Sequence, residues 1–189
     1  EVRMRSLPAG LIAMALGAVL VHSPAAGQTH AEIRGGLMVG SHTGTAAGLD
    51  LAPALSYEAL VMRQITPRLS VYGGYVRSAF GCEEGFCIEQ DLIVTGNHGV
   101  LGAGARKGWA WLRLGVLLGV TEVGTEGESP ALGPGIHAGA GFTFGSGRMR
   151  FTPGLSYRWL SAKTLSSSEH AVAVALDLGV GIRLGPSMH

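Results

Sequence analysis

The residues best arranged for covalent catalysis in this 189-residue chain form the run Ser166-Ser167-Ser168-Glu169-His170. A serine nucleophile needs a histidine within hydrogen-bond reach and an acid that orients this histidine. Glu169 and His170 are adjacent at the start of an extended segment, so their side chains point to opposite faces and cooperate poorly. We interpret the run as a serine-rich loop. No catalytic residue and no cofactor is expected.

Both cysteines, Cys82 and Cys87, fall in one predicted loop. A metal site would need further ligands nearby, and the C-x-x-C spacing of redox-active pairs is absent. The N-terminal residues 1–27 have the features of a cleaved export signal: Arg3 and Arg5, then an apolar stretch, then small residues before Gln28. Because export leads through an oxidising compartment, we expect a structural disulfide between the two cysteines.

The elements that position the remaining polar residues are long alternating strands. From His170 to Leu184 one parity carries only branched aliphatic residues and the other small or charged ones. This run of roughly 15 residues exceeds the usual strand of about five or six. It is long enough to cross a bilayer, for which roughly 9–11 tilted residues suffice.

Reading the chain for such alternation predicts eight strands, with a bulge in the fourth near 96–99. Short connections at 66–68, 107–108 and 145–148 alternate with longer ones at 42–55, 81–90, 121–133 and 161–169. Short turns at one end and long loops at the other are typical of bacterial outer-membrane barrels. The predicted fold is thus all-β, an eight-stranded antiparallel up-and-down transmembrane β-barrel over residues 28–189. Its strands are expected at 30–41, 56–65, 69–80, 91–106, 109–120, 134–144, 149–160 and 170–184.

Composition supports this class. Charged residues make up 14% of the chain, against about 25% in a typical soluble domain. The formal net charge of +1 provides no basic patch, so no nucleic-acid partner is expected. After residue 27 no stretch of 18 apolar residues occurs, which excludes a helical membrane protein. The 31 glycines suit a narrow barrel with little room for interior side chains.

The two faces of the strands are predicted to be inverted relative to a soluble barrel. On each strand, the alternate residues that form the polar face are rich in glycine and poor in charge. Such a face has too few charged groups to be exposed to water, so we assign the apolar face to the outside. Aromatic residues near strand ends are interpreted as membrane-interface girdles. These are Trp109, Trp111, Phe144 and Phe151 by the turns, and Tyr57, Tyr157, Trp159 and Phe80 by the loops.

Charged residues on the inward parity are predicted to form an ion-pair network, because buried charges must pair or meet water. A small proton or ion path is the alternative, which the width of an eight-stranded barrel disfavours. His98 and His137 are interpreted as isolated structural residues. The predicted network comprises Glu32, Arg34, Glu58, Arg113, Arg150, Arg158, Asp177 and Arg183.

From Gln28 to Leu184 this pattern resembles the small eight-stranded outer-membrane barrels, such as the OmpA membrane domain, OmpX and the opacity-like adhesins. The resemblance rests on strand pattern and connection lengths. It implies residence in the cell outer membrane, insertion through the barrel-assembly machinery, and contact with outer-membrane lipid and lipopolysaccharide. It also implies a role that ranges in such families from envelope stability to adhesion, with an extracellular partner bound by the loops.

Acidic residues in two loops, at 83–91 and 122–128, could bind Ca²⁺ or bridge to lipopolysaccharide phosphates. Solvated loop charge is the simpler interpretation, and no metal site is predicted. Arg68, Arg106, Lys107 and Arg148 in the turns are expected against anionic headgroups of the inner leaflet.

The expected function is therefore non-enzymatic, either stabilising the envelope or mediating surface interactions. Two alternatives remain open. One is an outer-membrane lipid-modifying enzyme, which needs a Ser/His/acid cluster at the rim. The other is a soluble periplasmic lipocalin-like binding barrel, which needs apolar side chains inside.

Overall fold

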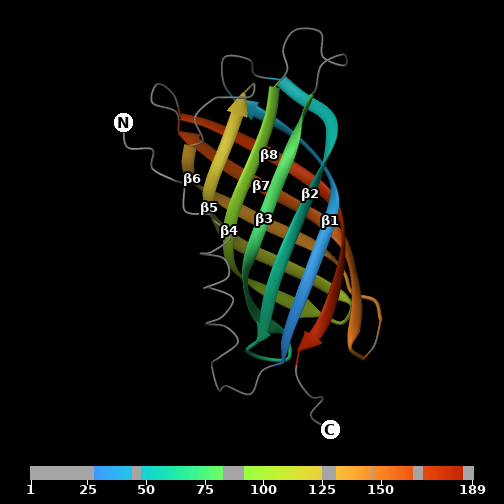
Figure 1. Cartoon of the computed structure of the whole chain (residues 1–189). Helices are drawn as coiled ribbons and strands as arrows, with labels where there is room; N and C mark the ends of the chain where they lie inside the picture. Colours follow the sequence, from blue (N-terminus) through green and yellow to red (C-terminus); the bar gives the residue numbers. More distant parts are fainter. Residues whose placement is uncertain are drawn as a thin grey trace.

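The computed structural model describes residues 28–43, 48–82, 92–124, 131–145, 147–163 and 168–184. They form a closed barrel in which each strand pairs antiparallel with its sequence neighbours (Figure 1). The predicted all-β, eight-stranded up-and-down barrel is confirmed. Its strands are β1 (Thr29–Thr43), β2 (Gly48–Gln64), β3 (Leu69–Cys82), β4 (Leu92–Lys107), β5 (Ala110–Gly124), β6 (Ala131–Phe142), β7 (Met149–Lys163) and β8 (Ser168–Leu184).

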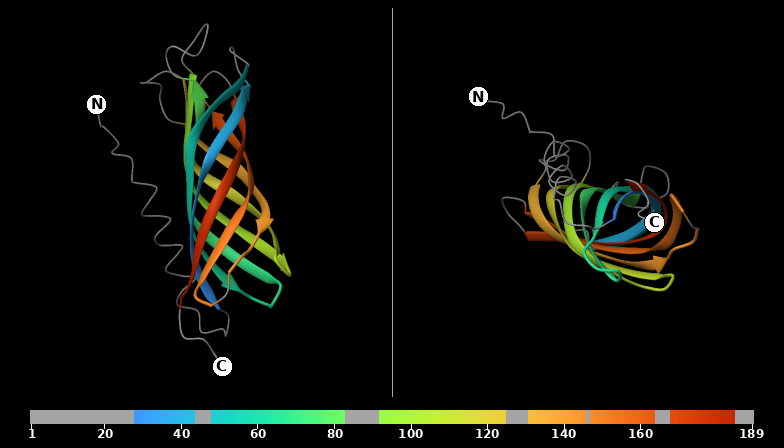
Figure 2. Two further views of the ribbon diagram at one scale, coloured as in Figure 1. Left: turned by 90° about the vertical axis from the view of Figure 1, so that its right-hand side faces the viewer. Right: turned by 90° about the horizontal axis from the view of Figure 1, so that it is seen from below.

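The first and last strands close the barrel. β1 pairs with β8 in unbroken register from Thr29↔Leu184 to Thr43↔His170, and the view along the barrel shows the resulting ring (Figure 2). Closure leaves neither the first nor the last strand as a free edge for intermolecular pairing. It also encloses an interior that only alternate residues of each strand can reach.

The barrel has two distinct ends. At the turn end, lower in Figure 1, β1 begins, β8 ends, and the connections β2–β3, β4–β5 and β6–β7 lie. Gly108 and Gly147 have φ angles of 61° and 82° in two of these turns, a region that side chains with a Cβ rarely adopt. The opposite end is the loop end.

Several strands are longer than predicted. β2 begins at Gly48 rather than at 56, and only residues 44–47 and 164–167 separate β1 from β2 and β7 from β8. The expected contrast in length between turns and loops is therefore smaller than predicted. Alternation fails to detect the start of β2 because Asp50 and Pro53 interrupt it. Pro53 lies where the pairing with β1 is irregular, so its missing N–H removes no ladder bond on that side.

The bulge predicted in β4 is wrong. Residues Gly96 to Gly99 pair in continuous register with both β3 and β5. The irregularities lie elsewhere, between Met38 and Gly40 in β1 and between Pro53 and Tyr57 in β2. A Cβ on Gly96 would lie 2.7 Å from Cε1 of His98, so this glycine makes room for an inward side chain and does not break the pairing.

Two predicted girdle aromatics point inward instead. Trp111 is 8% exposed and Phe80 is 1% exposed, because each shares the parity of inward residues on its strand. The other girdle residues fit better: Trp109, Phe144, Phe151, Tyr57 and Tyr157 are exposed on the outer surface. Trp159 is half-buried.

Candidate functional site: the charged barrel interior

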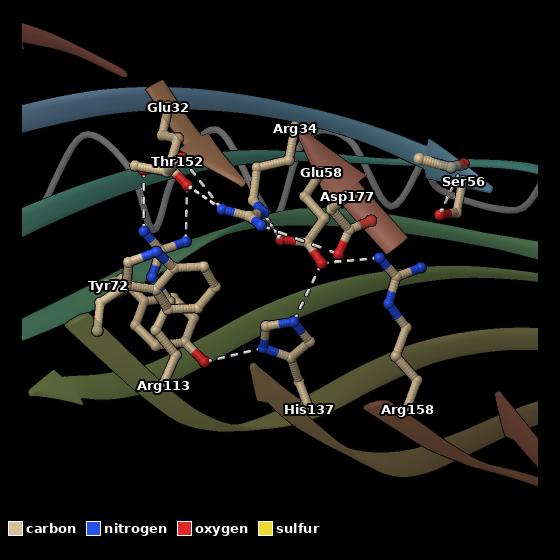
Figure 3. Close-up of polar contacts among 12 residues, drawn as sticks. Glu32, Arg34, Ser56, Glu58, Tyr72, Arg113, His137, Thr152, Arg158 and Asp177 are labelled. Atoms are coloured by element: carbon tan, nitrogen blue, oxygen red, sulfur yellow. Dashed lines mark hydrogen bonds and ion pairs between the residues drawn. The ribbon is translucent and has the colours of Figure 1, made fainter. Parts of the chain in front are cut away.

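Six of the eight charged residues predicted inside the barrel meet in one network (Figure 3). They are drawn from β1, β2, β5, β7 and β8. Each is nearly inaccessible to solvent, Arg113 being the most exposed at 6%. The members of this central network are Glu32, Arg34, Glu58, Arg113, Arg158 and Asp177.

Glu32 anchors the half of the network nearer the turn end. Arg113 binds it with both guanidinium nitrogens, at 2.7 Å from Nη1 to Oε1 and 2.9 Å from Nη2 to Oε2. Arg34 donates from Nη1 to the same Oε1 at 3.0 Å. This two-pronged arrangement is the strongest form of arginine–carboxylate pairing.

Glu58 organises the other half. Its Oε1 lies 2.7 Å from Nη2 of Arg158 and 3.0 Å from Nε2 of His137. A carboxylate only accepts, so Nε2 of His137 donates, and a neutral His137 then accepts at Nδ1 from the hydroxyl of Tyr72 at 3.0 Å. Arg158 also donates to Ser78 Oγ and to the carbonyl of Arg77.

Arg34 links the two halves. Its Nε lies 3.7 Å from Oε2 of Glu58, and its Nη2 lies 3.9 Å from Oδ2 of Asp177. Its Nη1 also donates to Thr152 at 3.1 Å. The indole of Trp111 lies between two guanidinium groups, 4.7 Å from that of Arg34 and 4.6 Å from that of Arg113. Such cation–π contacts stabilise desolvated arginines.

The network is electrically balanced, with three carboxylates and three guanidinium groups. Arg150 and Arg183 do not belong to it. They lie at the turn end, where Arg183 is the register partner of His30 across β1 and β8. Within the described ranges neither of them forms an ion pair with an acid.

Sequence reasoning missed the contacts of the interior histidines. His137 was interpreted as isolated, which is wrong, since it joins Glu58 to Tyr72. His98 likewise lies 3.1 Å from Oγ1 of Thr121. A usable signal was present: His137 shares its inward parity with Gly139 and Gly141, so it had to meet polar partners inside the barrel.

Beyond the network, toward the loop end, the interior is mainly apolar, apart from the pair of His98 and Thr121. Phe80 and Val94 are register partners near the ends of β3 and β4, and both are buried. Leu160 and Ala171 occupy the corresponding positions of β7 and β8. Charge and apolar packing together fill the middle and the loop-end part of the interior.

The outer surface carries the large apolar side chains, as predicted from the inverted faces. Ile33 and Leu37 of β1 and Leu176 of β8 are 69%, 59% and 69% exposed. Soluble monomers rarely expose a continuous apolar surface of this extent. Further members of this apolar exterior are Leu55, Leu101, Leu112, Leu114, Val116, Leu118, Leu132, Ile136, Leu155, Val174, Leu178 and Ile182.

The arrangement has little capacity for substrate chemistry at its centre. Glu58, His137 and Tyr72 form an acid–histidine–hydroxyl chain, but all three are at most 1% exposed, so no substrate reaches them. In the described part of the chain no cluster of His, Cys, Asp and Glu could hold a metal ion. The network instead ties strands on opposite sides of the barrel together.

Two predicted features fall where the structure gives no side-chain description. Cys87 lies outside the described residues and Cys82 is the last residue of β3, so the disulfide remains a prediction. The Ser166–Glu169 side chains also lie outside the described residues. His170 is half-buried, and its ring centroid lies 6.0 Å from that of Trp159. Glu122, which was predicted in a loop, lies in β5 and is exposed, because that strand extends further than predicted.

No helix among the described residues is long and apolar enough to span a membrane.

Fold and interior together define the class: the chain has the architecture of the small eight-stranded outer-membrane β-barrels. Neisserial surface protein A is similar at 12% identity and a TM-score of 0.54, covering 82% of this chain and 97% of that one. The attachment invasion locus protein Ail of Yersinia pestis is similar at 17% identity and a TM-score of 0.54, covering 83% and 99%. No family model matches the sequence. No curated protein matches it either.

Proposed function

We propose that the protein is a non-enzymatic outer-membrane β-barrel with a structural or surface-interaction role. The observation that supports this best is the inverted distribution of side chains. Leu176 is 69% exposed on the outside, whereas Arg34 is 1% exposed on the inside. Only an apolar solvent around the barrel makes both positions favourable.

The same distribution argues against a soluble lipocalin-like barrel. Such a protein would turn apolar side chains toward a ligand cavity and polar ones toward water. Here the middle of the interior is a balanced, desolvated ion network, and the exterior is aliphatic.

A pore is not part of the proposal. Arg158 and Glu58 are buried from solvent and bound to each other across the interior, and an eight-stranded barrel has no room for an aqueous channel beside them. The function then lies in the barrel as a membrane element and in the segments at its loop end. Ail, a structural neighbour, is named as an attachment and invasion protein, which is compatible with a surface-interaction role here.

The location is tested by expressing the full chain in a Gram-negative host and fractionating the envelope. We expect the protein in the outer-membrane fraction, with faster gel migration before boiling than after it. A soluble protein with unchanged migration would overturn the proposal.

Replacing residues 125–130 by a Gly/Ser segment separates the structural role from the surface-interaction role. Cells that lose only adherence when residues 125–130 are replaced favour surface interaction. Cells that become sensitive to detergent when the whole protein is deleted, but not when only this segment is replaced, favour envelope stability.

A further inference from the structure

A cavity opens at the turn end of the barrel interior. It has a volume of about 650 Å³ including its opening to solvent. His30 of β1, Arg106 of β4 and Arg150 of β7 line it, and the Glu32–Arg113 pair of the central network forms part of its wall. Its lining therefore comes from strands on different sides of the barrel.

This cavity lies beside a concentration of positive charge, the turn-end basic cluster of Arg106, Arg150 and Arg183, which lies next to His30. Both Arg106 and Arg183 lie close enough to Arg150 to repel it electrostatically. Arg183 faces His30 as its register partner.

The described residues provide no counter-charge for this cluster. Both oxygens of Glu32, the acid that lines the cavity, are bound by Arg113, and one of them also by Arg34. Across the described ranges, no ion pair joins Arg106, Arg150 or Arg183 to an acid. Three guanidinium charges thus face one another beside a cavity, and like charges held together destabilise a fold unless an anion joins them.

Two buried polar atoms without partners in the described part of the chain lie at the same end of the barrel. The Nε2 atom of His30 and the Nε atom of Arg183 are buried without a hydrogen-bond partner among the described residues. His30 is only 7% exposed and lines the cavity. Buried polar atoms nearly always have partners, and a ligand in the cavity would supply one to His30.

We propose that this turn-end cavity binds a phosphate-bearing anion. Arginine forks match phosphate oxygens in geometry, and free phosphates and phospholipid headgroups both present these oxygens. Met62 and Trp111 add apolar surface to the lining.

The anion has two conceivable sources. It is either a free phosphate compound that enters from solution or the headgroup of a phospholipid whose leaflet borders the turn end. The proposed binding site rests on the geometry of the interior and does not depend on the proposed function. Only binding of a phospholipid headgroup requires that the protein resides in a membrane.

The test uses the folded full-length protein and the variants Arg150→Gln and Arg183→Gln. Arg148→Gln is the matched control, because Arg148 lies at the same end and is exposed, and neither lines the cavity nor belongs to the basic cluster. Inorganic phosphate is titrated calorimetrically into each protein in a maltoside detergent, which contains no phosphate. Native mass spectrometry after reconstitution into vesicles of equal parts phosphatidylcholine and phosphatidylglycerol then reports which lipid is retained.

We expect binding that is about tenfold weaker in R150Q and R183Q, the typical effect of losing one charged hydrogen bond, and unchanged in R148Q. Phosphate binding in detergent identifies a free anion, whereas selective retention of phosphatidylglycerol without phosphate binding identifies a headgroup. If neither readout distinguishes R150Q and R183Q from R148Q, the proposal is wrong. Without added anion, R150Q and R183Q should unfold at a higher temperature than the parent protein, since each relieves repulsion. Lower unfolding temperatures would contradict the uncompensated cluster.

Discussion

Glu58 on β2 and Arg158 on β7 meet across the barrel, with 2.7 Å between Oε1 and Nη2, although their strands share no hydrogen-bonded edge. Backbone pairing connects each strand only to its two neighbours. The contact therefore fixes the shape of the barrel cross-section in a way that the ladders alone do not. Arg34 extends the link to β1 and, through Asp177, to β8.

Replacing Glu58 by Gln should destabilise the barrel by about 3–5 kcal/mol, the usual result of leaving a buried charge without its partner. Arg158 would retain only neutral acceptors, and His137 would lose the carboxylate at Nε2. Equilibrium unfolding by urea in detergent or lipid measures the change. Glu122→Gln serves as control, because Glu122 is exposed and should change stability by less than about 0.5 kcal/mol.

A double substitution sharpens this test. If the pair acts as a unit, Glu58→Gln combined with Arg158→Met should be less destabilising than the sum of the two single changes. Strict additivity would mean that the two side chains contribute independently. In that case the contact across the barrel would not hold its shape.

The alternating pattern was sufficient to predict the closed barrel, the orientation of its faces and six of the residues that meet inside it. Alternation is a property of the backbone, and parity places every second side chain in the interior. Which inward charges pair was not predictable, because Glu32 and Arg113 are 81 positions apart and their contact depends on strand stagger. Arg150 and Arg183 also lie on the inward face of their strands, but at the turn end. Alternation tells which face a side chain is on and does not tell how far along the barrel axis it lies.

Two glycines of the neighbouring strands β4 and β5 differ in how closely another backbone approaches them. Gly119 of β5 is the register partner of His98, and a Cβ at Gly119 would lie 2.1 Å from the carbonyl oxygen of Asn97. At the adjacent pair, a Cβ on Gly99 would lie 3.7 Å from the carbonyl oxygen of Leu118, an ordinary contact. Gly119→Ala should therefore destabilise the barrel by about 1–3 kcal/mol, as overpacking does. Gly99→Ala should be neutral or slightly stabilising.

Urea unfolding and gel migration before and after boiling distinguish these two variants. Equal behaviour of G119A and G99A would show that β4 and β5 do not approach as closely as described. Both substitutions add one methyl group to neighbouring strands, so differences in composition cannot explain a difference in outcome.

The predicted disulfide is accessible to a direct chemical test. Export through an oxidising compartment should join Cys82 to Cys87, so a maleimide-polyethylene glycol reagent should label the purified, denatured protein only after reduction. A loop this short contributes about 2 kcal/mol by the chain-entropy estimate. Cys82→Ser should lower stability by a similar amount and expose one thiol to labelling. Labelling of the untreated parent protein at two sites would exclude the bond.

A charge on the apolar exterior tests the membrane assignment itself. Leu176 lies in the middle of β8, opposite Leu37 and Leu155 of its neighbours, and is 69% exposed. In a bilayer, Leu176→Arg should destabilise the folded barrel by about 2–4 kcal/mol, while an arginine near the interface changes stability by about 0–1 kcal/mol. Ile65→Arg is the control, because Ile65 is 63% exposed in the turn between β2 and β3. Unfolding by urea in phosphatidylcholine vesicles measures both variants. In water an exposed arginine would be tolerated at either position, so equal stability of L176R and I65R would mean that lipid does not surround the middle of the barrel.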